Sequence, residues 1–307
     1  MNKLNYIKKQ IQKNWQLYVL LFLPLLYVIV FKYVPMAGVT LAFKDFKFKL
    51  GIFGSEWVGL ENFVKFLESY QFKRVFSNTI ILSLYTLLAG FPLPIIFALI
   101  LNCVKDGPFK KFSQTTVTLP HFISTTVIVG MLFQIFDART GLYGGLVELI
   151  TGEYPKNIFA ESGAFRHLYV WSGVWKGFGW GSIIYIASLS SVDPSYHEAA
   201  QIDGASRFQR VRYIDFPTIV PTVVTMLILR MGSVITLGFE KAYLMQNSFN
   251  ISTSDIIATY QYSVSMASSR ADFSYATAIG LFNNVIELVL VIIVNKISRK
   301  VSETSLW

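Results

Sequence analysis

Residues 191–221 read SVDPSYHEAAQIDGASRFQRVRYIDFPTIVP, and this polar stretch separates two apolar runs. The run before it covers about 166–190, and the run after it covers about 218–238. A helix needs about 20 predominantly apolar residues to cross a bilayer, and both runs are long enough. The sequence therefore predicts a membrane protein in which residues 191–217 form an extramembrane loop between two spans.

The composition of the whole chain agrees with a membrane protein. Of its 307 residues, 53% are hydrophobic and only 15% are charged, whereas soluble domains carry about 25% charged residues. The net charge of +9 indicates cytoplasmic loops in a protein of this class, and we expect no nucleic-acid binding. Cys103 is the only cysteine, which excludes an intrachain disulfide and any Cys-based metal or redox motif.

Six apolar runs can be recognised in the sequence. They cover about 17–36, 75–101, 114–136, 166–190, 218–238 and 274–295. The first run contains Pro24 and lacks an A-x-A-like cleavage site, so we interpret it as a retained helix rather than a signal peptide. In the second run, Pro92 and Pro94 predict a kink. The predicted fold is an all-α membrane protein with six transmembrane helices.

The segment between the first two runs contains one further predicted element. Residues 57–63 suggest a turn followed by a short helix, in which Phe63, Phe66 and Leu67 follow helical spacing. We expect this amphipathic piece to lie on the membrane surface.

The distribution of lysine and arginine predicts the orientation. Six spans place both termini on one side of the membrane. Basic residues concentrate in the short segments 1–16, 102–113, 191–217 and 296–300, and short basic segments mark the cytoplasmic side. We therefore predict cytoplasmic N- and C-termini and a cytoplasmic 191–217 loop.

The 191–217 loop begins with helix-start signals. Asp193 can cap a helix that has Pro194 at its first position. Alternatively, Ser195 and Glu198, three residues apart, can form a capping box. Either arrangement predicts a short helix through Ala199 and Ala200.

Gly204 is expected to end this helix in a left-handed conformation. A second short helix then begins near Ala205 or Ser206. The small side chains of residues 199–200 allow a partner to approach closely, which favours helix-in-groove docking with another protein. The alternative is a solvated linker.

The spacing of Glu198-Ala199-Ala200, Gly204, Ile214 and Pro217 resembles the EAA loop of permease subunits in bacterial binding-protein-dependent ABC importers. Phe216 stands where the family usually has leucine. Several further segments are similar to the polysaccharide- or oligosaccharide-type branch of the family; they are residues 57–63, 77–79, 119–120, 238–241, 278–283 and 305–307.

The resemblance implies that the loop docks into a cleft of a separate cytoplasmic ATPase. The coupling residues would be Glu198, Ala199, Ala200, Gly204, Arg207, Ile214 and Pro217. It also implies a transmembrane core of five helices within residues 75–307. Residues 1–74 would add a cytoplasmic arm, an extra first helix and an external segment.

The sequence has no G-x-x-x-x-G-K-[ST] motif. We therefore expect no cofactor and no enzymatic activity in this chain, with ATP and Mg bound by the partner ATPase. The resemblance implies a heterodimer with a second, homologous permease, together with two ATP-binding subunits and an extracellular solute-binding lipoprotein. The expected function is alternating-access import of an oligosaccharide across the bacterial cytoplasmic membrane.

Ionisable residues within apolar runs are candidates for function, because charge is costly inside a bilayer. The predicted substrate pathway comprises Trp171, Trp175, Lys176, Arg230, Ser233, Asn283, Asn284 and Glu287. Hydroxyls, amides and aromatic rings suit a neutral sugar. The alternative is that these polar groups hold helices together. Gly177, Gly179 and Gly181 indicate close helix packing rather than a phosphate site.

Other classes of membrane protein remain as alternatives. A secondary transporter or a channel would work without an ATPase, but repeats between the two halves are not evident. An ABC importer for a non-sugar solute is a further alternative. A membrane-embedded enzyme would need a nucleophile–base pair or a metal set, and His121, His167 and His197 are scattered without ligand spacing.

Overall fold

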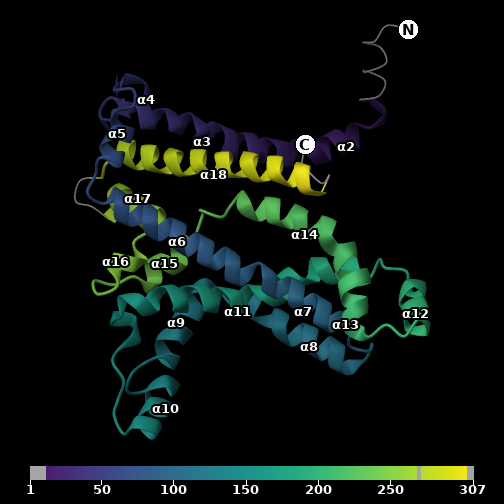
Figure 1. Ribbon diagram of the computed structural model, residues 1–307. Coiled ribbons are helices and arrows are strands. Elements are labelled where there is room, and N and C mark those ends of the chain that lie inside the picture. Colours follow the sequence, from purple (N-terminus) through teal and green to yellow (C-terminus); the bar gives the residue numbers. More distant parts are fainter. Residues whose placement is uncertain (1–11, 268–270, 303–307) are drawn as a thin grey trace, which may run out of the picture.

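The computed structural model describes residues 12–267 and 271–302 (Figure 1). This part of the chain is helical apart from its loops and one antiparallel pair, β1 (Lys44–Asp45) with β2 (Glu56–Trp57). The predicted all-α class is confirmed. Lys3, Lys8, Lys9 and residues 305–307, which the sequence interpretation used, lie outside the described residues.

Four helices within these residues are long and apolar enough to cross a membrane. They are Trp15–Phe43, Phe72–Asn102, Arg207–Met231 and Phe273–Ile297, and a bent pair at Pro108–Ile135 would make a fifth. α11 (Ser162–Leu189) has 28 residues, which is long enough to span. It is not among these apolar helices, because glycine, serine and charged residues interrupt its aliphatic ones.

The first membrane helix runs without a break through Pro24. It consists of α2 (Trp15–Val28), the π turn η1 (Ile29–Tyr33), α3 (Val34–Met36) and the 3-10 turn η2 (Ala37–Phe43). No side chain of α2 is buried. Figure 1 shows the helix lying along α18 (Phe273–Ser302) at one edge of the bundle. An all-round apolar surface of this kind suits a lipid-facing helix.

Proline interrupts the next two predicted spans. The second divides into α6 (Phe72–Gly90) and α7 (Pro92–Asn102) at Phe91, where the sequence predicts a kink. The third was predicted as one helix over 114–136, and this prediction is wrong.

The third segment instead forms α8 (Pro108–Thr118), the 3-10 turn η3 (Leu119–Phe122) and α9 (Thr125–Ile135), with a bend of 100°. Ser124 accepts a hydrogen bond from the Val127 amide at 3.3 Å. This N-cap begins a new helix after the Pro120 turn.

α11 lies at the centre of the bundle and packs on α6, α7, α8 and α14 (Phe216–Met231). Gly179 makes one of these contacts possible: a Cβ there would lie 2.1 Å from the carbonyl oxygen of Val117 in α8. The predicted close packing is thus confirmed at Gly179. At Gly177 an added Cβ would meet nothing within 4 Å, so this glycine borders open space.

The fifth span ends earlier than predicted. α14 stops at Met231, whereas the sequence predicts a span to residue 238. Gly232, Ser233 and the β-branched residues after them disfavour helix, and residues 232–238 are non-helical. The chain continues into four short elements: α15 (Phe239–Met245), α16 (Ile251–Ser254), α17 (Ile257–Tyr262) and the π turn η6 (Ser263–Ala267).

The helix predicted after residues 57–63 is present as α5 (Glu61–Leu67). Its Phe66 is fully buried against Val75, Ile257, Tyr275 and Ile279. The helix therefore docks on the bundle, and its position relative to the membrane surface stays a prediction. Three further short elements lie at the same end of the bundle as α5: α4 (Gly51–Gly54), α10 (Leu142–Thr151) and the 3-10 turn η4 (Ile158–Ala160).

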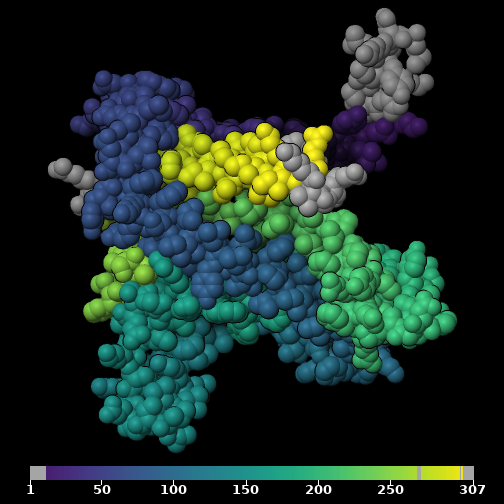
Figure 2. Space-filling model, viewed as in Figure 1, coloured from purple at the N-terminus to yellow at the C-terminus, as the bar shows by residue number. Residues whose placement is uncertain are grey.

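The two ends of the bundle differ in what they present. α12 (Pro194–Ile202) and α13 (Arg207–Arg210) project at one end, while α5, α10 and α15–α17 occupy the other (Figure 1). In Figure 2, α12 forms a green lobe on the right and α10 a teal lobe at the lower left. The start of α2 and the end of α18 lie toward the α12 end.

Candidate functional site

The 191–217 loop folds as two helices. α12 begins at an Asp193 cap, whose side chain accepts a hydrogen bond from the Ser195 amide at 2.9 Å, with Pro194 at the first helical position. Of the two helix starts compatible with the sequence, this is the one adopted. Hydrogen bonds from Ser195 also hold the pKa of the Asp193 carboxyl below its usual value.

Gly204 separates the two helices with a φ of 77°, a conformation that favours glycine. The amide of Ala205 bonds back to the carbonyl of Ala200 at 2.8 Å, which closes the end of α12. α13 then begins with a reciprocal capping box between Ser206 and Gln209. The predicted pair of helices joined at Gly204 is present.

α12 and α13 have no buried residue. Five of the seven predicted coupling residues are exposed, namely Glu198, Ala199, Gly204, Arg207 and Pro217, while Ala200 and Ile214 are half-buried. Large apolar side chains are exposed beside them: Tyr196, Ile202, Phe208 and Tyr213, with Ile202 at 87%. Clustered apolar side chains on a projecting loop indicate an interaction surface. Their sequence positions do not single them out, because their exposure depends on how the loop projects.

A single buried carboxylate ties the loop to the bundle. Asp215 is 2% exposed and belongs to the π turn η5 (Val211–Asp215), which leads directly into α14. It accepts a hydrogen bond from Asn102 Nδ2 at the end of α7 at 3.1 Å, and it lies 3.2 Å from His197 Nε2 in α12. Asp215 therefore joins α7, α12 and α14. Nothing in the loop's spacing pattern singled it out.

A cavity of about 680 Å³ lies between α12 and the end of α7. Two predicted coupling residues, Glu198 and Arg207, line it together with Asp215. The cavity does not include Ile214 or Pro217; Pro217 is an exposed residue in the first turn of α14.

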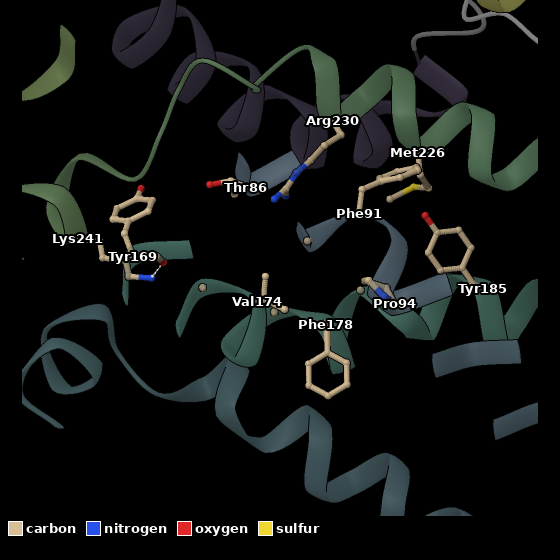
Figure 3. A pocket seen from close by; sticks show the side chains of 14 residues that line it. Thr86, Phe91, Pro94, Tyr169, Val174, Phe178, Tyr185, Met226, Arg230 and Lys241 are labelled. Atoms are coloured by element: carbon tan, nitrogen blue, oxygen red, sulfur yellow. Dashed lines mark hydrogen bonds between the residues drawn. The ribbon is translucent and has the colours of Figure 1, made fainter. Parts of the chain in front are cut away.

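A second, central cavity of about 260 Å³ lies among α6, α7, α11, α14 and α15. Figure 3 shows the side chains that surround it, and six of them matter below: Thr86, Phe91, Tyr169, Tyr185, Arg230 and Lys241. Gly173, Gly177 and Gly181 recur every fourth residue along the α11 wall. Their missing side chains leave the space open.

Arg230 is the one predicted pathway residue on the lining of the central cavity. Trp171 and Trp175 instead line a separate apolar cavity of about 420 Å³ between α9 and α11. The Trp171 indole donates to the Tyr85 hydroxyl at 2.8 Å. Lys176 Nζ lies 3.5 Å from the hydroxyl oxygen of Thr125.

The remaining predicted pathway residues lie around the end of α14 and on α18. The Ser233 hydroxyl donates to the Arg230 carbonyl at 3.4 Å. Glu287 on α18 accepts a hydrogen bond from Thr236, across the non-helical segment. Asn284 is exposed and Asn283 is partly buried. The contact between Glu287 and Thr236 suits the alternative that polar groups hold segments of the bundle together, whereas the Ser233 bond stays within the end of α14.

Lys241 lines the central cavity, although its sequence position suggested an external loop. α15 turns back into the bundle and buries Ala242 and Met245. Lys241 Nζ donates to the Tyr169 carbonyl at 2.6 Å and lies 4.7 Å from the centre of the Tyr169 ring. Only the break at 232–238 signals that the chain stays inside the bundle.

Known proteins are similar to this chain over most of its length. Residues 90–303 match the family described as "Binding-protein-dependent transport system inner membrane component". Protein LplB of Bacillus subtilis is 41% identical over 97% of this chain and 92% of its own length. The polygalacturonan/rhamnogalacturonan transport system permease protein YteP, also of Bacillus subtilis, is 38% identical over the same shares.

A solved structure also resembles the chain. It is a crystal structure of a bacterial ABC transporter involved in the import of the acidic polysaccharide alginate. The similarity covers 97% of this chain and 99% of that one, with 35% identity and a TM-score of 0.88. A second crystal structure shows a bacterial alginate ABC transporter with a periplasmic protein that holds an alginate pentasaccharide, and the similarity has the same values.

Proposed function

Because the chain belongs to the family of binding-protein-dependent transport system inner membrane components, we propose that it is the permease subunit through which an ABC importer carries an oligosaccharide across the bacterial cytoplasmic membrane. The observation that carries this proposal is the continuity of the 191–217 loop with α14, which brings Arg230 to the central cavity. YteP is named for the transport of polygalacturonan and rhamnogalacturonan, and the solved structure for the import of the acidic polysaccharide alginate.

In this proposal the chain crosses the membrane six times. The broken pair α8–α9 and the central helix α11 serve as spans beside the four apolar helices. Both termini and the 191–217 loop lie in the cytoplasm, which the lysine and arginine distribution favours. Short elements at the opposite end, including α10 and α15–α17, then belong to the external half.

The loop would dock on a cytoplasmic ATPase. Glu198, Ala199 and Gly204 are exposed on it, and Ile202 offers an apolar side chain that has no cover in the described chain. A short helix laid into a groove is a common way to bind such a surface. Two ATP-binding subunits would hold ATP and Mg, and this chain would contribute no catalytic residue.

Further partners follow from the pathway. This chain would supply one side of it, and a second, homologous permease in a heterodimer would supply the other. An extracellular solute-binding lipoprotein would deliver the sugar to the external face. The structure similar to this chain that holds a loaded periplasmic protein supports such a partner.

Movement of the loop would open and close the pathway by alternating access. A displacement of α12 acts on Asp215 through His197, and Asp215 also holds Asn102 at the end of α7. α7 and α14 both line the central cavity. Closure of the ATPase pair would therefore shift two walls of the cavity together, as in other rigid-body transitions.

Replacement of Glu198 by Ala tests the coupling. The side chain is exposed, so its loss should change stability by less than about 0.5 kcal/mol. We expect the variant to assemble and hydrolyse ATP while vesicles fail to take up sugar. A tagged wild-type chain should also bring an ATPase and a second permease through purification from membranes. Normal uptake by the variant, or purification of the chain alone, would contradict the proposed coupling.

A further inference from the structure

Arg230 carries a positive charge far along α14 from the loop, on a residue that is exposed in the described part of the chain. It lies 14 residues beyond Phe216, the first residue of α14, which corresponds to about 21 Å along the helix. A guanidinium at that depth requires a partner or a polar cavity. No salt bridge within the described residues involves Arg230, and Figure 3 shows its side chain reaching into the central cavity.

Lys241 brings a second cation to the same cavity from α15. Its ammonium group can donate three hydrogen bonds, and the described chain supplies one protein acceptor, the Tyr169 carbonyl. Gly173 makes room for it, because a Cβ at this position would lie 3.3 Å from Lys241 Nζ.

The nearby carboxylates are engaged elsewhere. Glu240 accepts a hydrogen bond from Thr126 at 3.0 Å, and Glu287 accepts one from Thr236. No Asp or Glu is among the described residues that line the central cavity. Thr86, on the same lining, has a hydroxyl oxygen without a hydrogen-bond partner in the described chain. The cavity thus combines two cations and an unpaired hydroxyl.

A neutral sugar would leave both cations unpaired, which is costly away from bulk water. A carboxylate would pair with them: the planar guanidinium can bind it through two parallel hydrogen bonds, and the ammonium can bind it as a point charge. Phe91 and Tyr185 add aromatic faces on which a sugar ring can pack. The volume of about 260 Å³ is just below the range of about 300–1,000 Å³ for small-molecule sites, which suits one sugar unit at a time.

We propose that the central cavity is a carboxylate-binding station for an acidic oligosaccharide, in which Arg230 and Lys241 bind the uronate carboxylates as the chain passes. This inference rests on the proposed function as an oligosaccharide permease, and it specifies the substrate class. It replaces the neutral sugar expected from the sequence.

Uptake into vesicles by the complete transporter, with its binding protein, tests the proposal. The probes are a galacturonate trimer and a mannuronate trimer, the galacturonate trimer with its carboxyl groups reduced, and sn-glycerol 3-phosphate. We compare the wild type with Arg230→Met/Lys241→Met, and with Arg230→Lys and Lys241→Arg, which keep the charge. ATPase activity stimulated by the loaded binding protein reports whether docking and coupling survive.

The expected result is uptake of an acidic trimer that falls about tenfold or more in the double Met variant, while stimulated ATPase activity persists and the charge-keeping variants retain most uptake. Wild-type uptake of acidic trimers by the double Met variant overturns the carboxylate station and leaves the proposed function intact. So does wild-type transport of the reduced trimer in place of the acidic ones. Transport of sn-glycerol 3-phosphate with no trimer overturns both.

Because the double variant could fail to assemble, thermal unfolding of the purified complex accompanies the assay. Neither cation is in a salt bridge within the described residues, so their removal should leave the unfolding midpoint unchanged or raise it. A lowered midpoint, with uptake of every probe lost in the charge-keeping variants as well, would show that Arg230 and Lys241 hold the fold together rather than bind substrate.

Discussion

The 191–217 loop and the central cavity are the two ends of one connected element, yet they are built in opposite ways. The loop takes its shape from hydrogen bonds between near neighbours, such as the Ser195 amide with the Asp193 side chain and the Ala205 amide with the Ala200 carbonyl. The cavity arises where five helices distant in sequence meet, and its decisive side chains come from α14 and α15. The loop, which is built locally, suits a contact that many ATPase subunits share. The cavity, which is built by tertiary packing, can vary with the substrate.

Substitution of Gly179 has the largest expected effect, because Gly179 lies on the packed face of α11, whereas Gly177 borders open space. Gly179→Ala would place a Cβ 2.1 Å from the Val117 carbonyl oxygen, and overpacking against backbone costs about 3 kcal/mol or more. We expect loss of the assembled complex, measured by its yield from membranes. Gly177→Ala is the matched control and should assemble normally, since nothing lies within 4 Å of its added Cβ.

Gly204 tests the loop. Gly204→Val forces a β-branched residue into the left-handed region, at a cost of about 1–3 kcal/mol, and should displace α12 from α13. We expect uptake of every substrate to be lost while the ATPase subunits still hydrolyse ATP. Gly204→Asn is the control, since asparagine tolerates this conformation, and it should retain most uptake. Equal uptake by the Val and Asn variants would contradict a conformational role.

Gly177 tests the cavity without touching the loop. Gly177→Leu should extend a side chain into the open space beside the central cavity and obstruct passage. We expect uptake to fall about tenfold, equivalent to about 1.4 kcal/mol, with ATPase stimulation by the binding protein preserved. If hydrolysis and uptake fell together, the separation between the two regions would be wrong.

Asp215 links the two regions. Asp215→Asn keeps the shape of the side chain and removes the charge that faces His197, a loss of about 1 kcal/mol. We expect uptake to fall about fivefold relative to ATP hydrolysis, because α12 and α14 then move less tightly together. Transport per ATP hydrolysed is the measurement. An unchanged ratio would mean that the covalent connection alone transmits the movement.

Asp193 gives the smallest expected effect. Asp193→Ala removes the N-cap of α12, worth about 1 kcal/mol. Faster amide hydrogen exchange in the first turn of α12 is the expected result, with uptake nearly unchanged. Asp193→Asn, which can still cap, should restore protection of these amides.

The same contrast explains how much could be predicted from the sequence. Capping and turn chemistry act over three or four residues, so the helices around Gly204 and the interruption at Pro92 were predictable. The breaks at residues 119–124 and 232–238 were not, because both interrupt apolar runs whose composition fits a continuous span. Because the sequence predicts a continuous span to residue 238, Lys241 was assigned to an external loop.

The candidate sites divide in the same way. The exposure of Glu198 and Ala199 agrees with the docking role that the small side chains and the resemblance to the EAA loop imply, and this role stays a prediction. In the pathway set, Arg230 lines the central cavity, whereas Trp171 and Trp175 line a different cavity, and the pathway role of all three stays a prediction. A residue's face on a helix can be calculated from its number, whereas the neighbour that it faces depends on the packing of the whole bundle.

The π turn η5 fixes the angular phase between the loop and α14. Residues Val211–Asp215 hold one residue more than an α-helical turn would use. Since each residue of an α-helix turns the chain by about 100°, this extra residue sets the azimuth at which α12 projects from the axis of α14. The number of residues between Glu198 and Pro217 therefore determines the direction in which α12 projects. Deletion of a single residue within this interval would rotate the docking helix by about a quarter-turn about the axis of α14, even with every side chain of the surface intact.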